Sequence, residues 1–262
     1  MSRIIEAATH AIDSIRINAM SREERDGRVF WVKQRRAWSL PIIYCANAFF
    51  SAVGNPVIVL SDPDEWQYWE TSSFHLLHGH EGYKAFGDGK RRVYAEQVPG
   101  VSLEDCSQDG TLTMPMVKAS GAELYRAHQF KSERLNSRWS HGDPHLGNFL
   151  FDPQTERARL IDFEVAHLPG LSETERLADD VLVFLQDLLG RTTAEQWVPM
   201  ATCFVCSYGD ESILRVLEKR LDTPTGIARL WWAIRTSYLP EKERNRRLAI
   251  LREIVRTTAG VR

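Results

Sequence analysis

The sequence predicts an α+β fold with two lobes, a small, partly β N-terminal part and a mainly helical C-terminal part. Short apolar strand patterns occupy residues 28–33 and 92–98, and turn residues bound each of them. Helical patterns dominate later and continue from residue 177 to the end. A chain of 262 residues, 43% of them hydrophobic, can bury a full core as one large domain or as two lobes.

Composition narrows the class of protein. The 33 basic and 35 acidic residues leave a net charge of −2, so we expect no nucleic-acid partner. The four cysteines are too few and too scattered for a disulfide framework, which is typical of a reducing compartment. Residues 3–18 have apolar positions at helical spacing, interleaved with charges, and predict an amphipathic helix rather than a secretory signal. We therefore expect a cytoplasmic protein.

One pair of motifs indicates the chemistry. The segment His141-Gly-Asp-Pro-His-Leu-Gly-Asn148 is followed by Leu160-Ile-Asp-Phe-Glu164. The first segment contains a candidate base, Asp143, and an oxygen donor, Asn148. The second segment contains another oxygen donor, Asp162. Phosphoryl transfer from ATP to an alcohol requires a proton acceptor and oxygen ligands for magnesium beside the phosphates. The motifs therefore indicate a phosphotransferase that uses ATP and Mg²⁺.

The residues between these motifs predict a β-hairpin. Apolar strand patterns at 149–152 and 158–161 flank a turn-rich stretch at 153–156. Such a hairpin would hold Asn148 and Asp162 at the same end. The alternative is a polar surface turn with an unrelated buried aspartate.

Loop, hairpin and carboxylate together resemble the catalytic and metal-binding loops of the protein-kinase-like superfamily. The resemblance implies a two-lobed fold, with an N-lobe at residues 1–98 and a helical C-lobe at 99–262. It also implies that Asp143 is the catalytic base and that Asn148 and Asp162 bind magnesium. Asp179 or Asp180 would then hold the catalytic loop through its backbone N–H groups.

The resemblance also assigns nucleotide-binding residues. Lys33, on what would be the third strand of the N-lobe, would contact the ATP phosphates. Glu70, on a helix predicted from Pro63 and capped by Ser61, would orient it. Backbone groups from Glu96 to Val98 would bind the adenine edge, as in a hinge between lobes.

Three departures limit the resemblance. Before Lys33 the chain has a single glycine, Gly27, so a glycine-rich phosphate loop is missing. About fifteen residues separate Asp162 from the next helix, too few for a long activation segment. Glu164 stands where ordinary protein kinases have glycine. The last two departures favour the lipopolysaccharide kinase and aminoglycoside phosphotransferase branches, and the missing glycine-rich loop leaves a non-catalytic protein as an alternative.

An apolar segment, residues 40–60, and a basic C-terminus bear on the acceptor. The first fourteen residues of the apolar segment, 40–53, are nearly all apolar. Fourteen residues are too few to span a bilayer, which needs about 20, so we interpret them as a core helix in preference to an interfacial one. If the segment is instead an interfacial helix, we expect the protein to contact the inner membrane peripherally. The preferred acceptor is a sugar hydroxyl of a lipopolysaccharide core or related glycolipid. Alternatives are a small-molecule kinase of the aminoglycoside or choline type, an atypical Ser/Thr protein kinase, and a nucleotide-binding pseudokinase scaffold.

Overall fold

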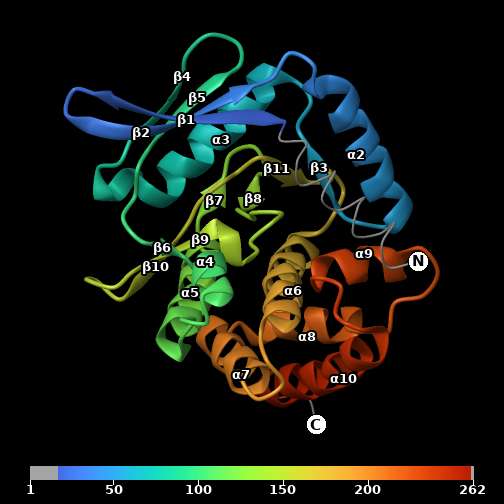
Figure 1. Cartoon of the computed structure of the whole chain (residues 1–262). Coiled ribbons are helices and arrows are strands. Elements are labelled where there is room, and N and C mark those ends of the chain that lie inside the picture. The colour runs from blue at the N-terminus through green and yellow to red at the C-terminus, as the bar shows by residue number, and fades with distance from the viewer. Residues whose placement is uncertain (1–16, 261–262) are drawn as a thin grey trace. The chain divides into compact units, whose positions relative to one another are not determined.

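The computed structural model describes residues 17–260, which form two compact units. The first comprises the chain up to Phe49 together with Val59–Gln97, and the second comprises Phe50–Ile58 together with Val98–Arg262. The predicted α+β fold is confirmed, because the first unit contains a small antiparallel sheet and the second is mainly helical (Figure 1). The predicted N-terminal helix lies almost wholly outside the described residues, and Asn18 already begins a strand.

The sheet of the first unit has the strand order β1-β2-β5-β4, and all neighbours are antiparallel. The strands are β1 (Asn18–Arg25), β2 (Arg28–Arg35), β4 (Ala85–Gly87) and β5 (Arg92–Glu96). Asp26 and Gly27 form the predicted turn, with φ of 52° and 72°, the left-handed values that a two-residue hairpin favours. Lys33 lies on β2, the second described strand, whereas the resemblance implied the third strand of the N-lobe.

Helix α3 (Pro63–His78) packs against β4 and β5 of this sheet. Its N-terminus is capped by the carboxylate of Asp62 rather than by Ser61, since Asp62 accepts hydrogen bonds from two backbone N–H groups of the first turn at 3.0 and 2.8 Å. The apolar face of this helix is buried, and Glu70 lies on the same face. A short 3₁₀ turn, η1 (Gly79–Glu81), follows the helix.

The apolar segment at residues 40–60 forms helix α2 (Ser39–Val53) and strand β3 (Val57–Val59). The preference for a core helix is wrong for most of α2. Ile43 and Val53 are buried, whereas Leu40 and Tyr44 are 43% and 59% exposed. Because α2 contains no charged residue, its exposed face is apolar. Among residues 17–260, no helix has both the length and the hydropathy needed to cross a bilayer.

The β-structure of the second unit centres on the predicted hairpin of β9 (Phe149–Asp152) and β10 (Arg157–Leu160). Strand β6 (Val101–Ser102) extends it by pairing with β9. Strand β11 (Val165–His167) pairs with β3, most of which belongs to this unit. Strands β7 (Lys131–Ser132) and β8 (Ser137–Arg138) form a separate ribbon.

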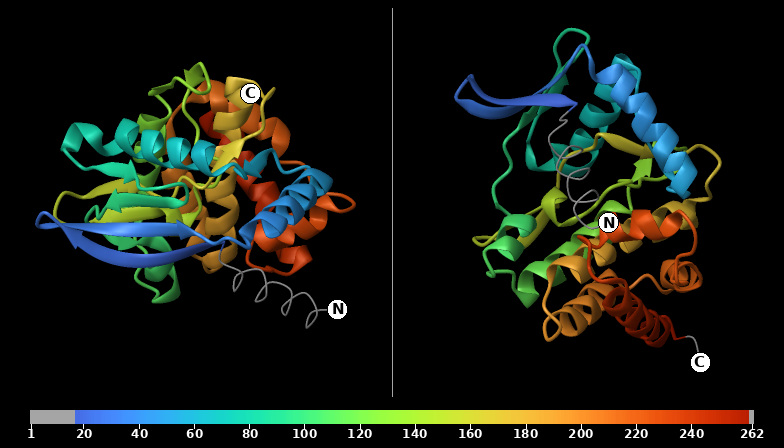
Figure 2. Two further views of the ribbon diagram at one scale, coloured as in Figure 1. Left: turned by 90° about the horizontal axis from the view of Figure 1, so that it is seen from above. Right: turned by 45° about the vertical axis from the view of Figure 1, so that its right-hand side comes forward.

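Helix α6 lies at the centre of the helical part and contacts α7, α8, α9 and α10 (Figure 2). Its Phe184 stacks on Phe204 of α7 with ring centroids 3.9 Å apart. The helices are α4 (Leu103–Gln108), α5 (Met114–Ala127), α6 (Glu173–Arg191), α7 (Trp197–Tyr208), α8 (Glu211–Arg220), α9 (Ala228–Arg235) and α10 (Glu241–Thr258). The prediction of a helical C-terminal part is confirmed.

Candidate active site

Residues 141–148 lie between β8 and β9 and carry Asp143, and we call them the base loop. Asp180 of α6 holds the start of this loop. Its two carboxylate oxygens accept hydrogen bonds from the backbone N–H groups of His141 and Gly142, both at 2.7 Å. Gly142 has a φ of 90°, and an added Cβ would approach the Val165 side chain to 3.2 Å, so the turn favours glycine. Of the two aspartates proposed for this contact, the structure therefore selects Asp180.

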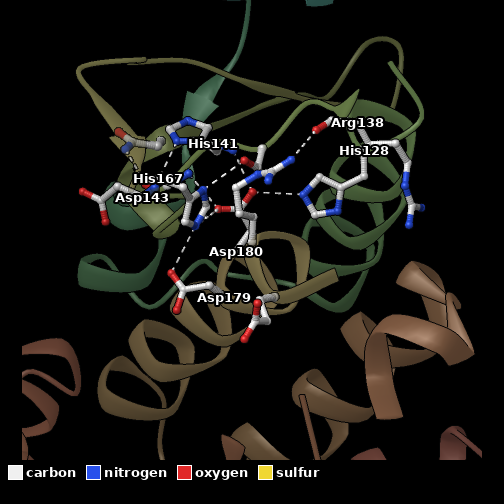
Figure 3. Close-up of polar contacts among 12 residues, drawn as sticks. His128, Arg138, His141, Asp143, His167, Asp179 and Asp180 are labelled. Carbon is white, nitrogen blue, oxygen red and sulfur yellow. Dashed lines mark hydrogen bonds and ion pairs between the residues drawn. The ribbon is translucent and has the colours of Figure 1, made fainter. Parts of the chain in front are cut away.

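A buried hydrogen-bond network surrounds Asp180 (Figure 3). His128 Nε2 lies 3.0 Å from the Asp180 carboxylate, and His128 Nδ1 lies 2.9 Å from the Tyr208 hydroxyl. Burial lowers the pKa of His128 below its ordinary value and raises that of Tyr208. His128 is therefore neutral, with Nε2–H donating to Asp180 and Nδ1 accepting from Tyr208. Beside this network, His167 bonds Asp179 at 3.3 Å and Ser140 at 2.9 Å.

We expect acid to destabilise the fold through His128. Its folded pKa is lowered, so this stability is complete above the ordinary value of 6.5 and is lost as pH falls below it, because the unfolded chain binds the proton more readily. Urea unfolding between about pH 7.5 and about pH 5.5 measures the loss. His128→Gln should flatten this part of the pH dependence. An unchanged slope in the variant would show that another group is responsible.

The far end of the base loop is held by a second aspartate of α6, two turns beyond Asp180. Asp187 accepts a hydrogen bond from the Leu146 backbone N–H at 2.9 Å. Arg191 bonds Asp187 at 2.6 Å and Glu104 at 2.8 Å, which fixes both carboxylates. Because residues seven apart lie on the same face of a helix, one face of α6 fixes both ends of the base loop.

Asn148 and Asp162 adjoin the same end of the β9–β10 hairpin, as predicted. The Ile161 N–H donates to the Asn148 carbonyl at 3.0 Å, so Asp162 directly follows a residue that is bonded to Asn148. His141 Nε2 also bonds the Ile161 carbonyl, at 3.0 Å. The Asn148 Nδ2 donates to the Asp143 carbonyl at 2.8 Å. These bonds bring Asp143, Asn148 and Asp162 into one neighbourhood of the second unit.

The donor set fits a magnesium ion. Because Asn148 uses its Nδ2 for the Asp143 carbonyl, its side-chain oxygen Oδ1 is the atom that could contact a cation. Asp162 has a φ of 66°, a left-handed conformation that is uncommon for a residue other than glycine and often marks a functional site. One amide oxygen and one carboxylate suit magnesium, which completes its shell with water and substrate phosphates. Residues 17–260 contain no group of three or more His, Cys, Asp or Glu residues arranged to bind a metal.

Asp143 is ion-paired with Arg235, at the end of α9. Its carboxylate is 31% exposed and points away from Asp180 (Figure 3). Burial alone would raise the pKa of Asp143, but the charge of Arg235, with contributions from His145 and His141, lowers it to about 2. Asp143 is thus ionised at neutral pH, as a proton acceptor must be.

In the first unit the predicted Lys33–Glu70 pair is present. Lys33 Nζ lies 2.5 Å from the Glu70 carboxylate, and both side chains are buried. Strand β2 supplies the lysine and α3 the glutamate. The pair forms as the resemblance implied, and its role toward a nucleotide stays a prediction.

Lys33→Met should lower kcat/KM for ATP by roughly 100-fold, by removing a charge from the phosphates. It should also destabilise the fold by about 3–5 kcal/mol, because Glu70 stays buried without its cation. The double variant Lys33→Met/Glu70→Leu should recover most of the stability without recovering activity. A double variant as active as wild type would contradict the phosphate-binding role.

The hinge residues are only in part available for adenine. The Glu96 N–H donates to the Lys84 carbonyl at 2.8 Å, and its carboxylate pairs with Arg28 at 2.8 Å. The neighbouring Gln97 N–H donates to the Val29 carbonyl, also at 2.8 Å. A nucleotide base therefore cannot use the Glu96 N–H without breaking the sheet. Val98, which is buried, remains the predicted backbone contact.

Sequence reasoning missed two residues of this site. Asp187 could have been found from its spacing to Asp180 on the predicted helix. Arg235 has no local signal, because its contact with Asp143 joins residues 92 positions apart. It depends on how α9 packs.

No family model matches this chain, and no curated protein does so. Among solved structures, the chain is similar to Rv3197 of Mycobacterium tuberculosis, described in a complex with erythromycin, with a TM-score of 0.41 and 18% identity over 93% of this chain and 71% of that one. It is also similar to vaccinia related kinase 3, with a TM-score of 0.35 and 12% identity over 90% of this chain and 85% of that one. Neither similarity carries the functional argument. Along the chain, the sheet that carries the Lys–Glu pair is followed by the base loop, the β9–β10 hairpin and α6.

Proposed function

We propose that this protein is a phosphotransferase that moves the γ-phosphoryl group of ATP to an alcohol, with Mg²⁺ as cofactor. The observation that carries the proposal is the pair of hydrogen bonds that Asn148 makes, one from its Nδ2 to the Asp143 carbonyl and one from the N–H of Ile161, the neighbour of Asp162, to its own carbonyl. They support a site in which the ionised Asp143 carboxylate serves as the base and the Asn148 and Asp162 side chains serve as the magnesium ligands. Little covalent chemistry is required of the protein in such a reaction, so positioning and charge compensation supply most of the rate.

Each residue then has one task. Asp143 orients the acceptor hydroxyl and takes its proton as the oxygen attacks the γ-phosphorus and ADP leaves. Asn148 and Asp162 would hold the magnesium ion, which offsets negative charge on the phosphate oxygens when bound. Lys33, oriented by Glu70, would neutralise further phosphate charge. Asp180 and Asp187 keep the base loop in place through the hydrogen bonds described above.

The preferred acceptor is a sugar hydroxyl of a lipopolysaccharide core or a related glycolipid. The exposed apolar face of α2, with Leu40 and Tyr44, supports this choice, since an uncharged surface of this kind is typical of a lipid-facing or partner-facing helix. The basic C-terminus supports a glycolipid acceptor less strongly than α2 does. Its exposed arginines, Arg246, Arg252 and Arg256, are each paired with acidic residues of the chain.

A second candidate is a pseudokinase scaffold, which one observation favours. The β1–β2 hairpin turns through Asp26 and Gly27, where kinases have a glycine-rich loop that covers the phosphates. A two-residue turn offers few backbone N–H groups to a triphosphate.

A transfer screen with γ-labelled ATP and Mg²⁺ tests the proposal. Purified lipopolysaccharide cores, aminoglycosides, choline and a mixture of proteins serve as acceptors, with wild type and Asp162→Ala compared. Label transferred by wild type but not by Asp162→Ala supports the proposed function, and the labelled acceptor identifies the class. No transfer to any acceptor, with ATP still bound, would favour the scaffold.

A further inference from the structure

The ion pair between Arg235 and Asp143 places a cation directly on the proposed base. The Arg235 side chain is only 11% exposed, and its guanidinium lies over the Trp231 ring with Cζ 4.7 Å from the ring centroid. Trp231 in turn packs edge-on against Phe50 at 5.3 Å. Arg235 is therefore held in one orientation rather than extended into solvent.

The backbone that carries Arg235 is also fixed. The next residue, Thr236, is fully buried, and its backbone packs so closely on Gly190 of α6 that an added Cβ would lie 2.4 Å from it. Ser237 and Tyr238 follow with φ of 48° and 58°, two successive left-handed residues that are not glycine. Such strain persists only where the surrounding structure imposes it, and it is frequent at functional sites. The fold thus places Arg235 against Asp143.

The guanidinium has hydrogen-bonding capacity left over. Arginine offers five N–H donors in a planar fork. Arg235 uses Nη1 for Asp143, and within the described part of the chain no group accepts a hydrogen bond from its buried Nε. A buried donor in this state gains free energy from an incoming acceptor oxygen. The fork geometry matches a phosphate or a carboxylate, which it can bind through two parallel bonds.

We propose that Arg235 is a specificity-determining residue, which binds a phosphate or carboxylate group carried by the acceptor alcohol. This inference rests on the proposed function and names the class of its acceptor. An anionic group that binds the unused donors of the guanidinium shares its positive charge with Asp143, which weakens the Arg235–Asp143 ion pair and makes the carboxylate more available to the hydroxyl. A neutral alcohol has to share Asp143 with Arg235. A cationic acceptor, such as an aminoglycoside or choline, brings like charge against Arg235 and is disfavoured.

Arginine Nε–H resonances measured by NMR test the anion site without any need for turnover. The resonance of Arg235 is identified by its loss in Arg235→Lys, and the probes are glycerol 3-phosphate, glycerate, inorganic phosphate and, as the neutral match, glycerol. We expect a saturable shift with the anions and none with glycerol. Asp143→Asn should tighten anion binding roughly tenfold, because the competing carboxylate is removed. Exposed Arg252, which pairs with Glu218 and Asp222, is the control for effects of ionic strength.

The outcomes separate the inference from the proposed function. Anion-dependent shifts of Arg235 support the inference even if no phosphoryl transfer is found, in which case the proposed function alone fails. The inference is overturned if the Arg235 resonance does not respond to any of the anions, or shifts no more than that of Arg252. If transfer is found, Arg235→Lys should raise KM for a phosphorylated or carboxylated acceptor roughly 10- to 100-fold while KM for ATP stays constant. An unchanged acceptor KM would equally contradict it.

Discussion

Replacement of Asp143 by asparagine should reduce phosphoryl transfer by about 10²- to 10⁴-fold in kcat, the usual contribution of a positioned general base. The amide keeps the size of the side chain and its place in the base loop, but it does not accept the hydroxyl proton. The backbone bonds of the loop use the main chain of Asp143 and not its carboxylate, so the loop should keep its shape. Steady-state transfer from labelled ATP measures the effect.

Asp109→Asn is the matched control, since Asp109 is an exposed aspartate of the same unit at the end of α4. It should transfer phosphate at the wild-type rate. Unfolding curves of Asp143→Asn that overlay those of wild type would exclude misfolding as the cause of lost activity. Equal turnover by Asp143→Asn and wild type would contradict the assignment of the base.

Asp180→Asn should destabilise the fold by about 3–5 kcal/mol. Asp180 accepts hydrogen bonds from two backbone N–H groups and from His128, and it is completely buried. An asparagine presents an N–H₂ group where a carboxylate oxygen now accepts, so at least one buried donor would face another donor. Urea unfolding of the purified variant gives the free-energy difference.

The adjacent Asp179 provides a demanding comparison. It is also buried, but it bonds the side chains of His167 and Arg220, both at 3.3 Å. Asp179→Asn should therefore destabilise the protein less than Asp180→Asn and leave the base loop in place. If the two substitutions destabilise equally, backbone bonding to the loop is not the reason for the importance of Asp180.

The parts of the site that lie close together in sequence were predictable. The base loop, the hairpin and Asp162 span about two dozen residues, and the alternation of turn and strand residues determines how they meet. The Lys33–Glu70 pair was predictable from the order of elements alone, because the resemblance implies a strand that carries the lysine, followed along the chain by a helix that carries the glutamate. These predictions required no knowledge of how distant helices pack.

Three features could not be predicted, each for a physical reason. Strand β1 is mostly exposed and polar, so it lacks the alternating pattern that marks a half-buried strand. Helix α2 is apolar on all sides, and an apolar helix gives no periodicity to tell a buried face from an exposed one. Arg235 reaches Asp143 only because α9 packs on α6 and Gly190 admits the Thr236 backbone. Long-range packing of this kind leaves no trace in a local pattern.

Calorimetric titration of ATP, with and without Mg²⁺, tests the central claim most directly. If Asn148 and Asp162 hold a magnesium ion against the phosphates, ATP should bind wild type with Mg²⁺ and much more weakly without it. The double variant Asn148→Ala/Asp162→Ala should lose the difference while its fold, followed by circular dichroism, is kept. A protein that binds ATP equally well with and without the ion, or in which the double variant keeps the full effect of magnesium, would contradict the account.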